Sequence, residues 1–199
     1  MNVRLSTELS MFASICWMGE VTNNLYSIGL GLETNTEDNL EQNVAVGRIR
    51  TYVQDLLHSS IIIDQQYATQ IKQFTALGFK TITLPEQPFD QSVAIMLYCK
   101  LNAICEGKLT VTDITLSSTA GDNMRYHFDA EDAFGPFADD GWWHETDPSW
   151  CDHSAENPSG KVLKMDRKLT WNDLGLSWDG NTPQDDGGNV VVGDFGKKE

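Results

Sequence analysis

The 199-residue chain is poor in basic residues, with 14 Lys and Arg against 29 Asp and Glu and a formal net charge of −15. Binding to nucleic acid or to anionic lipid depends on Lys and Arg that neutralise phosphate. The chain also lacks any stretch close to the roughly 18 consecutive apolar residues that a membrane-spanning helix needs. We therefore expect no direct nucleic-acid binding and no membrane partner. An acidic surface of this kind attracts basic protein surfaces instead.

Paired cysteines are absent too. The four cysteines, Cys16, Cys99, Cys105 and Cys151, are scattered without a CxxC motif, which argues against a zinc ribbon and against a disulfide framework. Free thiols fit a reducing compartment, and no signal peptide is evident among the first residues. We expect a cytoplasmic protein, located in the host cytoplasm if the chain is viral.

Cofactor and catalytic motifs are likewise missing. Gly29-x-Gly31 begins like a dinucleotide fingerprint, but Thr34 occupies the position of the third glycine. The histidines and serines show no spacing that indicates a nucleophile with its base. The sequence therefore predicts no cofactor.

Hydrophobic periodicity is clear in residues 1–128 and predicts the order ββαβαβαββ. The predicted strands are 11–18, 25–33, 60–63, 79–84, 108–117 and 123–128, and the predicted helices are 36–57, 64–77 and 90–105. Asn tolerates left-handed backbone, so 22–24 is the predicted turn of the first hairpin. We expect an α/β or α+β fold with a mixed sheet of about six strands flanked by three helices.

Three details refine this prediction. Thr36 and Asp64 stand where N-caps of the first and second helices are expected. Only Lys100 and Asn102 interrupt the apolar character of the third helix, which places that helix at the centre of the core.

The periodicity stops near residue 128, and the charge changes there. Residues 1–127 carry 8 basic and 13 acidic side chains, whereas residues 128–199 carry 6 and 16. We therefore predict a core domain at 1–128 and an acidic, Trp-rich irregular arm at 129–199. Within the arm, 161–165 and 169–176 are expected to order locally, 179–189 to act as a linker, and 190–192 to form an edge strand or a docking segment.

Residues 128–156 hold nine carboxylates and three tryptophans but no Lys or Arg. Tryptophans are favoured at interface hot spots, and carboxylates steer a basic partner. The candidate partner-binding residues are Asp129, Glu131, Asp132, Asp139, Asp140, Trp142, Trp143, Glu145, Asp147 and Trp150. The alternative is structural, because irregular segments need large side chains that fold back on their own domain.

A metal site is the second candidate. His144, Cys151 and His153 carry side chains that bind zinc or iron. The spacing from Cys151 to His153 is too tight for common zinc patterns, and no second pair stands at a familiar distance. We therefore expect no metal here.

A row of carboxylates is the third candidate. Glu33, Asp64 and Glu86 lie at or just after the ends of predicted strands, and Asp90 follows closely. If the strands are parallel, these groups meet at one edge of the sheet, where open α/β folds bind ligands, and they would suit Mg²⁺ chemistry. Helix N-capping explains Asp64 and Asp90 equally well.

Three functions remain open at this stage. The first is a non-enzymatic acidic interaction protein, such as a viral-type inhibitor that mimics nucleic acid on the basic surface of a partner. The second is a structural subunit of a homo- or hetero-oligomer that uses its C-terminal arm. The third is a Mg²⁺-dependent hydrolase or phosphodiesterase that uses the carboxylate row.

Overall fold

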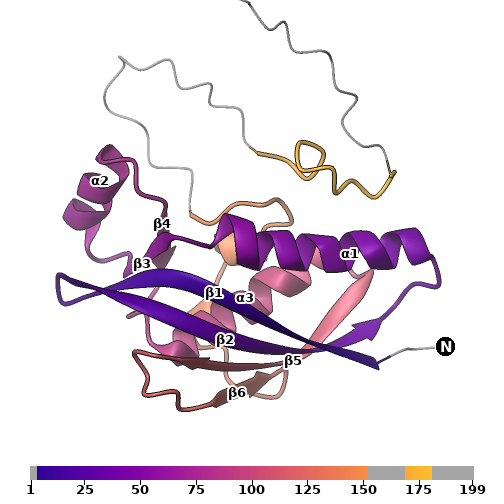
Figure 1. The fold of residues 1–199 in the computed structure, drawn as a ribbon, viewed down its shortest axis with the longest axis horizontal. Coiled ribbons are helices and arrows are strands. Elements are labelled where there is room, and N and C mark those ends of the chain that lie inside the picture. Colours follow the sequence, from indigo (N-terminus) through magenta and orange to yellow (C-terminus); the bar gives the residue numbers. More distant parts are fainter. Residues whose placement is uncertain (1–3, 152–168, 181–199) are drawn as a thin grey trace, which may run out of the picture.

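A computed structural model describes residues 4–151 and 169–180 of the chain (Figure 1). Six strands form one mixed sheet in the order β4-β3-β1-β2-β5-β6, and three α-helices accompany it. The elements are β1 Arg4–Trp17, β2 Glu20–Thr34, α1 Asn39–Thr51, β3 Ser60–Asp64, α2 Ala68–Ala76, β4 Thr81–Leu84, α3 Asp90–Cys105, β5 Leu109–Ser118 and β6 Tyr126–Asp129. The predicted fold class, element order and sheet size are confirmed.

The first hairpin is longer than the hydrophobic pattern indicated. β1 and β2 pair along their whole length, from Arg4 opposite Glu33 to Trp17 opposite Glu20. The turn is Met18–Gly19, both with positive φ, which suits a two-residue hairpin loop. The prediction of a turn at 22–24 was wrong, because these residues belong to β2 and pair with β1.

The two faces of the sheet are covered by different helices. Neighbouring residues of a strand point to opposite faces. On β3, Ile62 joins the main core, whereas Ile61 and Ile63 form a smaller cluster with Cys16. The α2 side chain of Phe74 packs on this smaller cluster. Helix α2 therefore covers the outer face of the parallel β3–β4 end, and α1 and α3 cover the inner face of the sheet (Figure 1).

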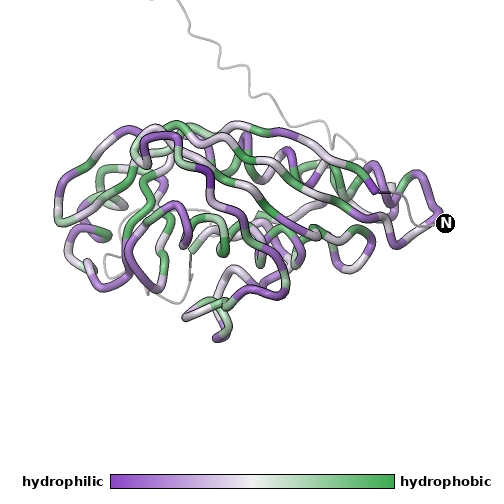
Figure 2. Tube along the Cα trace, turned by 90° about the horizontal axis from the view of Figure 1, so that it is seen from below, coloured by the Kyte–Doolittle hydropathy of each residue, from purple (hydrophilic) through white to green (hydrophobic). Residues whose placement is uncertain are grey.

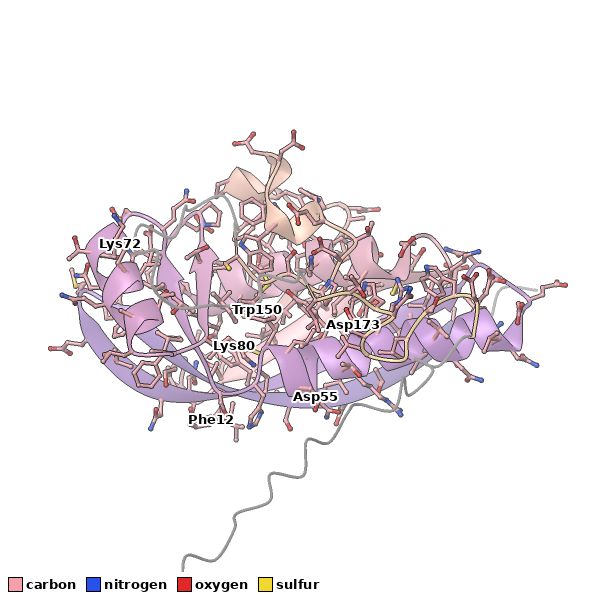
Figure 3. All side chains as sticks on the ribbon, turned by 90° about the horizontal axis from the view of Figure 1, so that it is seen from above. Phe12, Asp55, Lys72, Lys80, Trp150 and Asp173 are labelled. Atoms are coloured by element: carbon pink, nitrogen blue, oxygen red, sulfur yellow. The ribbon has the colours of Figure 1, made fainter. Side chains whose placement is uncertain are left out.

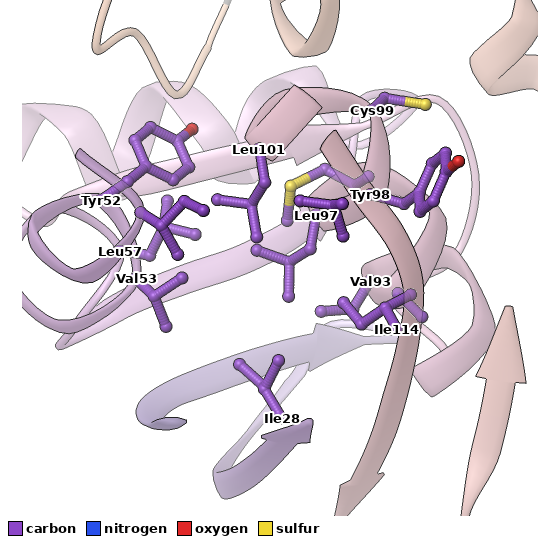
Figure 4. Packing of buried hydrophobic residues seen from close by; sticks show 14 of the residues in the cluster. Ile28, Tyr52, Val53, Leu57, Val93, Leu97, Tyr98, Cys99, Leu101 and Ile114 are labelled. Atoms are coloured by element: carbon purple, nitrogen blue, oxygen red, sulfur yellow. The ribbon is translucent and has the colours of Figure 1, made fainter. Parts of the chain in front are cut away.

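Helix α3 is the central element, as predicted. Twelve of its residues are buried, including Leu97 and Leu101. In the close-up of Figure 4 these two lie among side chains from the sheet and from the turn that follows α1, such as Ile28 and Tyr52. The tube in Figure 2 shows the corresponding alternation of hydrophilic and hydrophobic residues along the strands. A helix that is apolar all round must be covered on every side.

Two predicted helix caps were wrong. The side chain of Asp38, not Thr36, caps α1 by accepting from the Leu40 backbone N–H at 2.7 Å. Asp64 ends β3, and its carboxylate accepts from the Gln66 backbone N–H at 2.8 Å in the loop before α2. Both are local turns that satisfy backbone donors. After Thr51, α1 continues as a π-helical turn, Tyr52–Leu56.

Residues beyond 128 pack on the same core as those before it. Phe137, Trp142, Trp143 and Trp171 belong to the main hydrophobic cluster, and short 3-10 helices at Gly135–Ala138 and Trp142–His144 carry three of them. The part of the predicted arm up to residue 151 is thus a third layer over α3. The expected local pieces at 161–165 and 190–192, and most of the expected linker, lie outside the described residues.

Candidate functional site

The acidic layer, defined here as residues 129–150, is anchored by its own aromatic side chains. Trp142 is 0% exposed and Trp143 is 4% exposed. The indole N–H of Trp142 donates to the Thr83 carbonyl oxygen at 2.9 Å, and that of Trp143 donates to the Phe137 carbonyl oxygen at 3.0 Å. Both side chains are therefore packed and hydrogen-bonded inside this chain.

This burial decides what the two tryptophans can do. Removing a buried Trp from a core costs about 3–5 kcal/mol, a large share of the 5–15 kcal/mol that typically stabilises a domain. Trp142 and Trp143 cannot swing out to contact a partner at an acceptable cost. Trp142 and Trp143 therefore act as side chains that fold back on their own domain and not as interface anchors.

Trp150 lies at the margin of the layer. It is partly buried against the main core, and the Lys80 ammonium lies 5.7 Å from its ring centroid (Figure 3). Burial lowers the pKa of Lys80, while the nearby Asp55 charge acts in the opposite direction. A cation over a Trp face contributes about 0.5–1 kcal/mol at a partly exposed site, so this contact also serves the fold.

A buried lysine fixes the backbone of the acidic layer. Lys100 is 0% exposed, and its Nζ donates to the carbonyl oxygens of Trp142 at 2.9 Å and Glu145 at 2.7 Å and to the Ser149 hydroxyl at 3.2 Å. An ammonium is buried only where oxygens replace its hydration. The residue that interrupts the apolar pattern of α3 is thus the link between α3 and the layer above it.

A buried arginine, Arg48, holds residues 169–180 in a similar way. The Arg48 guanidinium lies 4.9 Å from the Trp171 ring centroid and 3.8 Å from that of Trp178. It donates to the Leu176 carbonyl oxygen at 2.9 Å and pairs with Glu106 at 2.6 Å. This segment is therefore bound along α1 through one buried cation.

The carboxylates of the acidic layer divide by exposure. Five are exposed, and they are Glu131, Asp132, Asp139, Asp140 and Glu145. Asp129 and Asp147 are half-buried and serve local structure: Asp129 accepts from the Glu131 backbone N–H and Asp147 from the Ser149 backbone N–H. Asp139, Asp140 and Glu145 lie next to backbone held by Trp142, Trp143 and Lys100, and Glu131 and Asp132 lie in the turn that begins at Asp129. No Lys or Arg lies between residues 128 and 156.

The candidate metal ligands that the structure describes, His144 and Cys151, are not part of a metal-ligand cluster. The His144 ring Nε2 lies 2.8 Å from the Phe137 carbonyl oxygen, Cys151 is half-buried, and His153 lies outside the described residues. Among residues 4–151 and 169–180, no three His, Cys, Asp or Glu side chains are grouped as a metal would require.

The predicted carboxylate row is divided between two ends of the sheet. Glu33 pairs with Arg4 at the start of β1, whereas Asp64 lies at the other end, where β3 runs parallel to β1 and β4. The expectation that Glu33 meets the others was wrong, because β3 and β4 run parallel to β1 and therefore antiparallel to β2. At the other end, Glu86 accepts from the Ser92 hydroxyl at 2.8 Å, and Asp64 accepts from the Gln87 amide at 2.9 Å; each already serves as a local acceptor.

A cleft of about 330 Å³ opens at that same end, between the end of β1, the start of α3 and the β5–β6 loop. Trp17 and Phe89 meet edge to face, with ring centroids 6.2 Å apart, and they are 49% and 52% exposed. The larger apolar lining residues are Ile15, Trp17, Pro88, Phe89, Met124 and Tyr126. Exposed apolar side chains around a hollow are a common feature of ligand-binding sites.

The cleft is also lined by a carboxylate, that of Asp90. Both carboxylate oxygens of Asp90, the first residue of α3, lie within hydrogen-bond distance of the Ser118 hydroxyl, at 2.7 and 2.9 Å. The Tyr26 phenol is fully buried. Burial and the nearby Asp90 charge raise its pKa, and the Asn24 side chain opposes this effect. Asp90 is the one member of the carboxylate row that lines this cleft.

The sequence did not identify the cleft. Its parts come from residues 15–17, 88–91 and 120–126, which no motif connects. The only signals were apolar residues in exposed contexts, namely Trp17 beside a two-residue turn and Phe89 just before a helix. An aromatic side chain at such a position lies outside the apolar face that its strand or helix turns toward the core.

The comparisons with known proteins are sparse. No protein-family model matches the chain, and no curated protein matches it. Among solved structures, the uncharacterised protein WS1659 from Wolinella succinogenes matches with 11% identity and a TM-score of 0.49. A catalytic-residue mutant of 6-pyruvoyltetrahydropterin synthase from Plasmodium vivax matches with 9% identity and a TM-score of 0.40. Each match covers 65% of this chain and 99% of the other, and neither similarity is high enough to transfer a property.

The described residues contain no helix with the length and apolar character needed to cross a membrane.

Proposed function

We propose that the chain is a non-enzymatic interaction protein that binds the basic surface of a partner protein through the acidic layer. The observation that carries the proposal is the placement of Asp139 and Asp140. Both are exposed, and only Gly141 separates them from the buried pair Trp142 and Trp143. Lys100 donates to the carbonyl oxygen of Trp142. Charges on a fixed backbone bind with less loss of conformational freedom than charges on a loose tail.

The charge of the chain limits the choice of partner. A second copy carries the same net charge of −15, and two such molecules repel one another. The partner is therefore a different protein, rich in Lys and Arg. Proteins that bind nucleic acid offer such surfaces, so an inhibitor that occupies a nucleic-acid groove, as a viral-type inhibitor would, is the specific form that we propose.

The hydrolase alternative receives no support from the geometry, because Glu33 is separated from the other carboxylates of the row. The subunit alternative depends largely on residues 152–168 and 181–199, which lie outside the described part of the chain. No structural observation supports either alternative as directly as the fixed carboxylates of the acidic layer support an interaction protein.

A pair of charge-matched variants tests the proposal. The first replaces three carboxylates of the acidic layer (Glu131→Gln, Asp139→Asn, Asp140→Asn), and the control replaces three exposed carboxylates elsewhere (Glu8→Gln, Glu20→Gln, Asp122→Asn). The probe is an oligo-arginine peptide, with affinity measured by fluorescence anisotropy at low salt. Because both variants change the net charge equally, only a site-specific effect separates them.

We expect the acidic-layer variant to bind about tenfold more weakly than the control variant, because close charges contribute more than distant, screened ones. Equal losses in the two variants would show that net charge alone attracts the peptide, and the proposal would then be wrong.

A further inference from the structure

The cleft at the start of α3 is independent of the acidic layer. It is formed by the end of β1, the first turn of α3 and the β5–β6 loop. The acidic layer is held instead by Lys100 and covers the later turns of α3. A ligand in the cleft would therefore contact neither the exposed carboxylates of the layer nor the backbone that positions them.

The size of the cleft suits one small molecule. Its volume of about 330 Å³ lies at the lower end of the range for small-molecule pockets. The rings of Trp17 and Phe89, with ring centroids 6.2 Å apart, and the Met124 side chain, which is 75% exposed, offer an apolar wall that the rest of the described chain leaves uncovered. Aromatic and thioether side chains favour contact with an apolar or aromatic group.

The charged lining residues have opposite signs, and they are Asp90 and Arg125. No ion pair joins them or links either to another residue in the described part of the chain. The Asp90 carboxylate is fixed by Ser118 on one side, and a Cβ added at Gly121 would lie 2.5 Å from Asp90 Oδ2. A carboxylate offers about four acceptor positions, so Asp90 keeps capacity for a donor from a ligand.

Four classes of small ligand can be compared with this pair of charges. An apolar cation would match Asp90 and leave Arg125 unused, and an apolar anion would do the reverse. A phosphate-bearing ligand finds a single arginine on a molecule of net charge −15, which is unfavourable. A zwitterion with an apolar body matches both charges and the wall at once.

We infer that the cleft binds a free apolar or aromatic α-amino acid. Its ammonium group donates to the Asp90 carboxylate, and its carboxylate accepts from the Arg125 guanidinium, whose planar fork suits that group. Its side chain lies against Trp17 and Phe89. The short distance between the two charges of an α-amino acid leaves the whole apolar wall for the side chain.

Isothermal titration calorimetry with L-phenylalanine tests this inference on the full chain. Phenethylamine, which lacks the carboxylate, and 3-phenylpropionate, which lacks the ammonium group, are the matched ligands. We expect saturable binding of L-phenylalanine at least tenfold tighter than that of either analogue. Absence of saturable binding at millimolar concentration, or equal binding of phenethylamine, would overturn the inference.

Variants locate the ligand in the cleft. Asp90→Asn keeps an oxygen for Ser118 but removes the charge, and Arg125→Gln removes the other charge at an exposed position; each should weaken L-phenylalanine binding at least tenfold. Met18→Ala, at the exposed hairpin turn and outside the cleft lining, is the control and should bind like the native chain. Circular dichroism checks that each variant is folded, and if Asp90→Asn is not, Arg125→Gln alone decides. Native-like binding by a folded Arg125→Gln variant would show that the ligand lies elsewhere.

Discussion

The Nζ atom of Lys100 lies 2.9 Å from the carbonyl oxygen of Trp142. A charged side chain from the central helix thus ends inside the third layer, where it also reaches Glu145 and Ser149. This contact explains how an irregular segment rich in carboxylates is held against an apolar core. Lys100 thus adds to the anchoring that Trp142 and Trp143 provide.

Replacing Lys100 with Met should destabilise the protein by about 2–4 kcal/mol. The methionine fills much of the space, but the carbonyl oxygens of Trp142 and Glu145 lose their buried donor, and each unsatisfied group costs about 1–3 kcal/mol. Urea unfolding measures the change. Lys72→Met, on the exposed side of α2, is the control and should change stability by less than about 0.5 kcal/mol. Equal stability of the two variants would mean that Lys100 does not hold the layer.

Replacing Arg48 with Lys should loosen residues 169–180 while leaving the sheet intact. Lysine keeps the charge, but it lacks the planar guanidinium that lies over Trp171 and Trp178 and donates to the Leu176 carbonyl oxygen. Hydrogen exchange followed by mass spectrometry should show faster exchange in this segment and unchanged exchange in β2 and β5. Unchanged protection of the segment would contradict the role of the guanidinium.

Alkaline pH should destabilise the fold. Burial raises the pKa of both Cys99 and Cys105 from the ordinary 9.0 to about 12, and burial also raises the pKa of the Tyr52 phenol. For each group the folded-state pKa exceeds the unfolded-state pKa. The contribution of these groups to the free energy of unfolding is therefore complete below about pH 9 and is lost as the pH rises toward 12. Each thiol should lower the free energy of unfolding by about 1.4 kcal/mol per pH unit in that window.

Melting temperatures followed by circular dichroism from about pH 8 to about pH 11 check this dependence. Cys99→Ala removes one titrating group, so its stability should fall less steeply with pH than that of the native chain. A native melting temperature that stays constant across this range would show that the thiols and phenols are not buried as described.

Much of the fold followed from local pattern. Hydrophobic periodicity predicted a strand at 25–33, and Tyr26, Ile28 and Leu30 face the core in β2. The unbroken apolar character around Lys100 placed α3 at the centre. Such patterns suffice because burial repeats with the period of the element itself.

Other features depended on contacts between distant segments. The separation of Glu33 from Asp64 depended on the parallel pairing of β3 with β1, which makes β3 antiparallel to β2 and which periodicity does not specify. The burial of Trp142 and Trp143 depended on α3 and on the carbonyl oxygen of Thr83, far away in the sequence. The role of Arg48 depended on Trp171 and Trp178, more than a hundred residues later in the chain. Composition could suggest these residues as important, but it could not show what covers them.

The most direct test of the account is a map of where a basic ligand binds. The amide resonances of the isotope-labelled chain are followed by NMR during titration with an oligo-arginine peptide. The proposal predicts that the largest shifts fall on residues 131–145, which include the exposed carboxylates of the acidic layer, and that they weaken as salt is added. Shifts spread evenly over all acidic regions, or centred on another face, would contradict it.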